Sequence, residues 1–142
     1  MSQLAPLGPV YQAGTLSGNP VATACGLATL KEIAKPGFFE SLSAKTSSLV
    51  QGLTQVAQEA GVPFCGDSQG GMFGFFFNAT LPQNYAAVMA TDKDRFNRFF
   101  HGMLDRGVYL APALYEAGFV SAAHSEEDIA HTLEAARQAL RL

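Results

Sequence analysis

The ten residues YQAGTLSGNP, Tyr11–Pro20, carry the most informative pattern in the chain. Glycines such as Gly14 let a backbone approach a ligand closely, and Thr15 adds a hydroxyl. Asn19 followed by Pro20 predicts a helix that begins here, because Asn is a favoured cap and Pro a favoured first residue. Hydroxyls and free N–H groups at a helix N-terminus suit an anion, particularly a phosphate. From these residues alone, a phosphate-binding loop and a plain loop with a helix cap both remain open.

Helical and strand patterns alternate along the rest of the chain. Apolar spacing predicts helices over residues 20–34, 38–60, 92–106 and 125–140, with a loop or weak helix at 81–91. Short strands are predicted at 62–65, 72–77, 107–110 and 119–122, the first two joined by the turn GDSQGG. Helices do not follow strands one for one. The order therefore predicts an α+β fold, with a small, largely antiparallel sheet covered by helices.

Two predicted helices have clear apolar faces and one has a clear start. The helix at 38–60 should bury Leu42, Thr46, Leu49, Leu53, Val56 and Ala60. The helix at 92–106 should point Phe96, Phe99, Phe100, Met103 and Leu104 inward. The sequence Ser125–Asp128 resembles a capping box, which predicts a helix start with Ile129, Leu133, Ala136 and Leu140 on its apolar side. The run Phe75–Phe77 indicates a strand that is buried on both faces or lies at an interface.

Composition narrows the possible functions. The chain has 142 residues, of which 48% are hydrophobic and 15% charged, as in an ordinary globular domain. The formal net charge is −3 and the basic residues form no run, which argues against a nucleic-acid partner. No apolar run approaches the roughly 20 residues that a membrane helix needs, and no signal peptide is visible. We therefore expect a cytoplasmic protein with no membrane partner.

The metal-ligating residue types are dispersed. Cys25 and Cys65 lie in no CxxC pair, which gives a zinc site no support and favours two reduced cysteines. His101, His124 and His131 lack ligand spacing, so capping or packing is the expected role. No metal site is predicted. The chain also lacks a GxSxG elbow, a Walker loop and a GxGxxG motif.

The loop Tyr11–Pro20 resembles that of the class III aminotransferases of fold type I, in which a threonine contacts the phosphate of pyridoxal 5'-phosphate across the dimer interface. The form with Leu-Ser between Gly-Thr and Gly-Asn-Pro is similar to the glutamate-1-semialdehyde aminomutase family. Ordinary aminotransferases of the class more often have Phe-Gly there. Three downstream segments also fit this family in order: GGMFGFFF at 70–77, GVYLAP at 107–112, and YEAGF at 115–119 followed by AHS.

The resemblance implies roles for three residues. Thr15 would contact the phosphate of the neighbouring subunit's cofactor, in its pyridoxal or pyridoxamine form, with the Gly14 backbone beside it. Glu116 in YEAGF would lie near the substrate entrance, or pair with an arginine from another part of the enzyme. Without the resemblance, Glu116 would be interpreted as a solvated loop acid. The implied reaction is the intramolecular amino transfer that converts glutamate-1-semialdehyde to 5-aminolevulinate in tetrapyrrole synthesis, performed by a homodimer.

No catalytic residue is expected in this chain. The family holds its cofactor on a lysine, yet Lys31, Lys35, Lys45 and Lys93 all stand outside the family's cofactor-lysine context. We therefore expect a C-terminal fragment that is inactive by itself. Residues 1–19 would be a leading segment with the phosphate-binding loop, and residues 20–142 the α+β domain.

Two other functions remain open from the sequence. The nearer is another class III aminotransferase, which moves an amino group between different molecules. The more distant is a freestanding, non-catalytic module that binds a phosphate compound or a protein.

Overall fold

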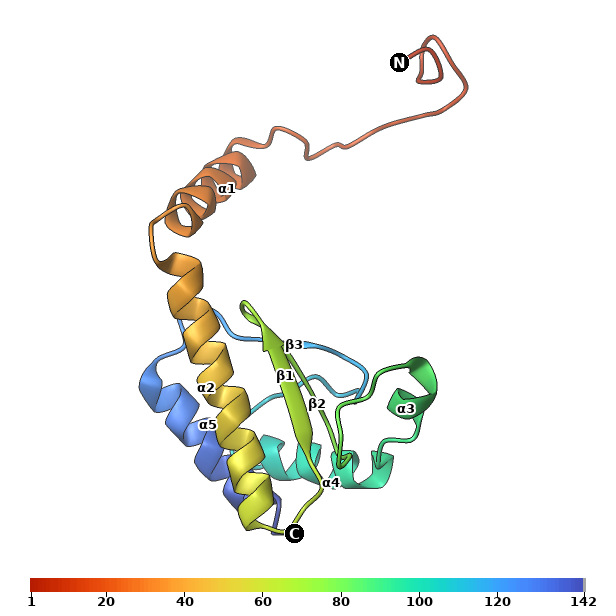
Figure 1. Ribbon diagram of the computed structural model, residues 1–142. Coiled ribbons are helices and arrows are strands. Elements are labelled where there is room, and N and C mark those ends of the chain that lie inside the picture. Colours follow the sequence, from red (N-terminus) through yellow and green to blue (C-terminus); the bar gives the residue numbers. More distant parts are fainter. Residues whose placement is uncertain (142) are drawn as a thin grey trace. The chain divides into compact units, whose positions relative to one another are not determined.

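The computed structural model describes residues 1–141 and divides into two compact units, Met1–Lys35 and Pro36–Leu142 (Figure 1). The first unit holds an N-terminal segment and helix α1, Pro20–Ile33. The segment forms an isolated bridge between Leu4 and Val10. Helix α1 begins where the sequence predicts, with Asn19 as its cap and Pro20 first. None of its fourteen residues is buried, so local signals and not packing define it.

The second unit begins with helix α2, Phe38–Glu59. Gly37 precedes it with φ of 80°, a conformation that favours glycine. The buried side of α2 matches the prediction at Thr46, Leu49, Leu53 and Val56, whereas Leu42 is only partly buried. The prediction for Ala60 is wrong, because the helix ends there and the residue is exposed. Val50 and Ala57 are buried instead.

The sheet has three strands in the order β1-β2-β3, and every pair is antiparallel. Strand β1 is Cys65–Gln69, β2 is Met72–Phe76 and β3 is Gly118–Phe119. The sequence placed the first strand three residues too early, because the supposed turn residues Gly66–Gln69 themselves form the ladder with β2. The actual turn is Gly70-Gly71. The φ of 59° at Gly70 suits a glycine at the first central position of a two-residue hairpin.

The predicted strand at 107–110 is absent from the described chain, and the cause is the end of helix α4, Lys93–Leu104. Gly107 has φ of 78°, and the Val108 N–H donates to the Met103 carbonyl at 3.0 Å. This is the hydrogen bond of a glycine-terminated helix, and it occupies an N–H that a strand would need. The predicted strand at 119–122 is also shorter than expected, being reduced to β3.

Phenylalanines make up much of the core between the sheet and α4. The rings of Phe75 and Phe77 lie 5.7 and 5.5 Å from that of Phe99, which is 2% exposed. Phe73 and, just after the strand, Phe77 are buried on the face that Phe75 shares, whereas Met72 on the opposite face is exposed and Phe76 is partly buried, so β2 is covered mainly on one face. The inward prediction holds for Phe96, Phe99, Phe100 and Met103, but it is wrong for Leu104, which is 42% exposed.

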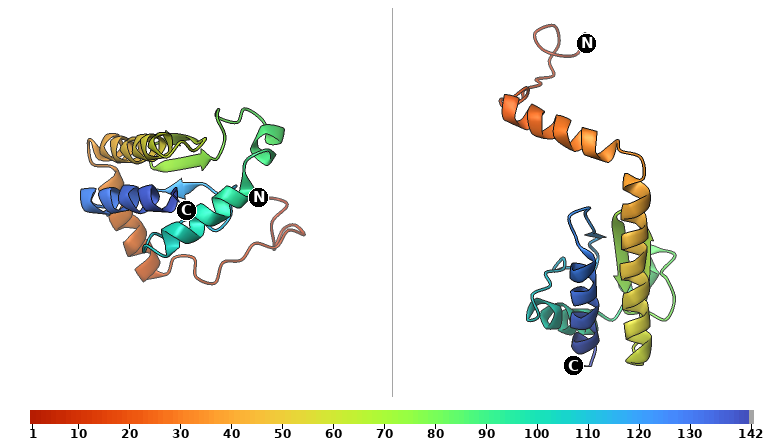
Figure 2. Two further views of the ribbon diagram at one scale, coloured as in Figure 1. Left: turned by 90° about the horizontal axis from the view of Figure 1, so that it is seen from below. Right: turned by 90° about the vertical axis from the view of Figure 1, so that its left-hand side faces the viewer.

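Helix α5, Glu126–Ala139, begins with the predicted capping box: Ser125 and Asp128 bond each other's backbone N–H groups. It lies beside α2 (Figure 2). At their contact, a Cβ on Gly52 would stand 2.6 Å from Leu133, so glycine allows the close approach. Ile129, Ala136 and Leu140 are buried as predicted and Leu133 is partly buried. The weak helix expected at 81–91 is α3, Tyr85–Met89.

The α+β class and the small antiparallel sheet are thus confirmed. None of the helices in residues 1–141 combines the length and the apolar character needed to cross a membrane.

Candidate functional site

The loop before α1 is built from two tight turns. The Ser17 N–H donates to the Gly14 carbonyl at 3.0 Å, and the Asn19 N–H donates to the Leu16 carbonyl at 3.0 Å. Gly18 has φ of 75°, a conformation open to glycine at little cost. A Cβ at position 14 would lie 2.3 Å from the Ser17 Oγ, so any larger residue there would displace that hydroxyl. The glycines therefore shape the loop as well as leaving its backbone open.

Thr15 stands at the exposed part of this loop. Among residues 1–141, no hydrogen-bond partner engages its hydroxyl. The only acid of the first unit, Glu32, lies at the far end of α1, on the order of 20 Å away along the helix. A free hydroxyl and an open backbone, with no carboxylate of the first unit close by, are compatible with an anion.

The start of α1 is capped by the Asn19 side chain. The Asn19 Oδ1 accepts from the N–H groups of Val21 and Ala22, each at 3.1 Å. These helix N–H groups are therefore already satisfied by the cap, which confirms the predicted role of Asn19 and removes them as free donors for an anion. What remains for an anion is the Thr15 hydroxyl and the backbone of the preceding turns.

Glu116 belongs to the second unit and is exposed. Its backbone N–H donates to the Ala113 carbonyl at 3.1 Å, which closes a turn over residues 113–116 shortly before β3. The residue borders a narrow hollow of about 20 Å³ among Phe73, Phe75 and Phe96. No ion pair engages its carboxylate within residues 1–141. Its side chain is thus available to a partner group or to substrate, and the structure does not bury it.

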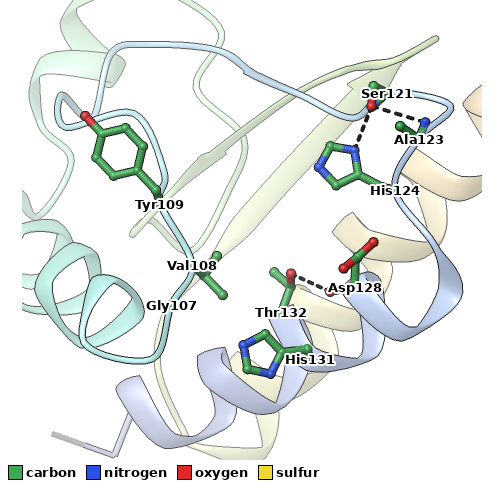
Figure 3. A pocket seen from close by; sticks show the side chains of 9 residues that line it. All are labelled: Gly107, Val108, Tyr109, Ser121, Ala123, His124, Asp128, His131 and Thr132. Atoms are coloured by element: carbon green, nitrogen blue, oxygen red, sulfur yellow. Dashed lines mark hydrogen bonds between the residues drawn. The ribbon is translucent and has the colours of Figure 1, made fainter.

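A larger hollow of about 450 Å³ lies between α5 and the segments 107–109 and 121–124 (Figure 3). His124 stands on one side of it, with His131 and Thr132 of α5 facing the same space and Tyr109 across from them. This hollow could not be predicted from the sequence, because residues far apart in the chain line it.

The family model for class-III aminotransferases matches residues 1–140. The chain belongs to the class III aminotransferase family.

Curated proteins similar to this chain include glutamate-1-semialdehyde 2,1-aminomutases. It is 74% identical over 99% of its length to the glutamate-1-semialdehyde 2,1-aminomutase of Leptothrix cholodnii, and 75% identical over 96% to that of Polaromonas naphthalenivorans. It covers 33% and 31% of those proteins, so it spans about a third of the length of the relatives it matches.

Solved class III structures share the fold. An omega-transaminase from Sphaerobacter thermophilus superposes with a TM-score of 0.78 at 25% identity, covering 96% of this chain and 32% of that one. A glutamate-1-semialdehyde-aminomutase from Pseudomonas aeruginosa gives 0.74 at 22%, covering 94% and 30%. A variant of the latter is described in complex with PMP, and another similar structure is a transaminase with PLP bound. At identities of 20–22% these likenesses show the fold alone.

Three of the four lysines of this chain are exposed, and the fourth is partly buried. Lys31, Lys35 and Lys93 are exposed, and Lys35 pairs with Glu32 at 2.5 Å. Lys45 is partly buried and donates from Nζ to the His124 carbonyl oxygen. None of the four lies in the 450 Å³ hollow. Lys31, Lys35 and Lys93 therefore lie at the surface, whereas Lys45 is held by its bond to the His124 carbonyl.

The cysteines form no disulfide with each other, and two of the histidines bond the backbone. Both cysteines are free; Cys25 is exposed and Cys65 partly buried, and burial raises the pKa of the Cys65 thiol. In residues 1–141, no cluster of three or more His, Cys, Asp or Glu could hold a metal ion. His124 and His131 each bond a backbone group, which is the capping or packing role expected for them.

Proposed function

We propose that this chain forms the C-terminal part of a glutamate-1-semialdehyde 2,1-aminomutase, which converts glutamate-1-semialdehyde to 5-aminolevulinate by moving an amino group within the molecule. The observation that carries this proposal is 74% identity over 99% of the chain to the Leptothrix cholodnii aminomutase. Because the chain spans about a third of such relatives, the complete activity requires polypeptide beyond these 142 residues. We further propose that the enzyme is a cytoplasmic homodimer.

Pyridoxal phosphate, when bound, supplies the electron sink through which an amino group is transferred. In this proposal the Thr15 hydroxyl donates to an oxygen of that phosphate, held by the neighbouring subunit. Gly14 keeps the backbone beside it uncovered. The free state of the Thr15 hydroxyl and the distance of Glu32 along α1 support this assignment. The capped N–H groups of Val21 and Ala22 leave Thr15, and not the helix end, as the contact.

Glu116 is proposed to act at the substrate entrance. Its exposed carboxylate, on a turn shortly before β3, can orient a cationic group of the substrate or pair with an arginine contributed by the rest of the enzyme. The small apolar hollow beside it limits water on one side. No proton transfer is assigned to it.

A graft tests the proposed reaction. The 142 residues replace the matching third of the Leptothrix cholodnii enzyme, and the product is assayed with glutamate-1-semialdehyde alone. We expect 5-aminolevulinate to form without any external amino donor. A graft that folds, binds the cofactor and transfers amino groups only from external donors would contradict the aminomutase assignment in favour of another class III aminotransferase.

The inactivity of the chain alone has its own test. The 142-residue chain is mixed with pyridoxal phosphate, reduced with borohydride and digested for mass spectrometry. We expect no single lysine to carry the cofactor in high yield, because Lys31, Lys35 and Lys93 are exposed and Lys45 is engaged by the His124 carbonyl. Stoichiometric labelling of one lysine, together with turnover, would overturn the expectation and favour a freestanding unit.

A further inference from the structure

The turn Ser121–His124 joins β3 to α5 and is closed by a histidine side chain. The His124 Nδ1 lies 2.9 Å from the Ser121 backbone nitrogen and 3.1 Å from the Ser121 Oγ (Figure 3). The His124 N–H donates back to the Ser121 carbonyl at 3.2 Å. On either side, the Val120 N–H donates to the Gly71 carbonyl at 2.8 Å, and Lys45 holds the His124 carbonyl. The imidazole is thus the side chain that ties the two ends of the turn together.

The chemistry of this contact fixes the proton on the ring. The Ser121 backbone N–H is a donor only, so the His124 Nδ1 must offer a lone pair. The neutral ring therefore carries its proton on Nε2. A second proton would go to Nδ1, which would turn the acceptor into a donor facing another donor. Protonation of His124 is incompatible with the Ser121 N–H bond.

His131 has the opposite dependence on protonation. Its Nε2 lies 2.9 Å from the Arg106 carbonyl oxygen, which accepts only. The Nε2 must therefore carry the proton, and adding a second proton at Nδ1 leaves this bond intact. The two histidines face the same hollow, yet only His124 loses a bond to the backbone on protonation. Its protonated Nδ1 can then donate to the Ser121 Oγ, which lies 3.1 Å away.

Charged groups from three directions surround the His124 ring. On α2, the Lys45 ammonium binds the His124 carbonyl and opposes a positive ring. On α5, the Asp128 carboxylate favours a positive ring, while the partial positive charge of the helix N-terminus opposes it. His131 and Tyr109 line the same hollow as the ring, with the Tyr109 hydroxyl pointing away from it (Figure 3). Glu126 and Glu127 add negative charge in the first turn of α5.

We propose that His124 is a proton-sensitive latch of the β3–α5 turn, which holds the turn when neutral and releases the Ser121 N–H when protonated. Histidine side chains in general change charge between about pH 5 and pH 8. Release loosens the turn that anchors β3, a strand of two residues. This inference does not depend on the proposed enzymatic activity.

Nuclear magnetic resonance of the 142-residue chain tests the latch. The Ser121 amide proton shift and its exchange protection are followed from about pH 8 to about pH 5, together with the ring nitrogens of both histidines. We expect the Ser121 amide signal to titrate together with the His124 ring, and its protection to fall roughly three- to tenfold, the effect of one lost hydrogen bond. The His131 ring should titrate without changing Ser121.

Two variants separate the latch from a general acid effect. His124→Asn keeps an acceptor at the Nδ1 position but cannot titrate, so the Ser121 signal should become independent of pH. His131→Gln keeps a donor toward Arg106, and the wild-type response should persist. A Ser121 amide in the wild-type chain that does not follow the His124 titration would overturn the proposal by itself. The same response surviving in His124→Asn would also overturn it.

Discussion

Helices α1 and α5 have the same length and opposite surroundings. Each has fourteen residues and an Asn or Ser cap, yet α1 buries none of its residues while α5 buries Ile129, Ala135, Ala136 and Ala139. Local sequence signals are enough to define where both helices begin. Packing, however, stabilises only α5. This difference indicates that the α1 side chains of the first unit are available to a partner or to solvent. The second unit, in contrast, has its own core.

Truncation of a core side chain in the second unit should have the largest effect on stability. Phe99→Ala removes a ring that is 2% exposed and packed against Phe75 and Phe77, so it should lower the free energy of unfolding by about 3 to 5 kcal/mol. Leu27→Ala in α1, where the side chain is 53% exposed, should change it by less than about 0.5 kcal/mol. Urea unfolding measures both. Equal effects would mean that α1 is packed in solution.

Two glycine substitutions in neighbouring strands test how tightly the sheet is packed. A Cβ at Gly118 would lie 2.3 Å from the Phe73 ring, so Gly118→Ala should destabilise the second unit by about 1 to 3 kcal/mol through forced repacking. Gly74→Ala, on the neighbouring strand, is the matched control, because no atom lies within 4 Å of its Cβ position. Thermal unfolding followed by circular dichroism compares the two. A Gly118→Ala variant as stable as Gly74→Ala would contradict the close packing at β3.

The two helix caps should respond differently. Ser125→Ala removes a capping box and should lower the global stability of the second unit by about 0.5 to 2 kcal/mol. Asn19→Ala should leave that stability unchanged and instead raise amide exchange at Val21 and Ala22, whose N–H groups it frees. Hydrogen exchange and urea unfolding of both variants measure this. A drop in global stability from Asn19→Ala would show that α1 unfolds together with the core.

A smaller effect should appear in the dependence of the melting temperature on pH. The hydrogen bonds from the Ser125 N–H and hydroxyl lower the pKa of Asp128. A carboxyl with a folded-state pKa below its unfolded value stabilises the fold above the unfolded pKa, and this contribution is lost as the pH falls through the folded pKa. Asp128→Asn should therefore show a weaker loss of melting temperature between neutral pH and about pH 3.

Glu126→Gln, in the same helical turn, serves as the control for this acid effect and should melt like the wild type across the range. If Asp128→Asn retained the full pH dependence of the wild type, the capping box would not be its source.

Much of this fold could be predicted from local chemistry. The cap at Asn19, the capping box at Ser125 and the glycine after α2 act within a few residues, so their sequence signals were sufficient. The predicted strand at 107–110 failed because the Val108 N–H is taken by the end of α4. Leu104 was predicted inward because it continues an apolar run, although it lies outside the buried face of α4.

The candidate site was less accessible to prediction. The sequence pointed to Gly14, Thr15 and Glu116 through the family resemblance, and their roles stay predictions. The predicted cap at Asn19 is confirmed, and it leaves the N–H groups of Val21 and Ala22 already bonded. The hollow around His124 was invisible, because α5 and the segments 107–109 and 121–124 meet only in the folded chain.

The central claim is that Thr15 contacts the cofactor phosphate, and cofactor affinity of the grafted Leptothrix cholodnii enzyme tests it most directly. Thr15→Ala should raise the Kd for pyridoxal phosphate roughly 10- to 100-fold, the effect of losing one hydrogen bond to a charged group. Thr15→Ser, which keeps the hydroxyl, should stay within about threefold of the wild type, as should Ser17→Ala. Unchanged affinity in Thr15→Ala would contradict the account.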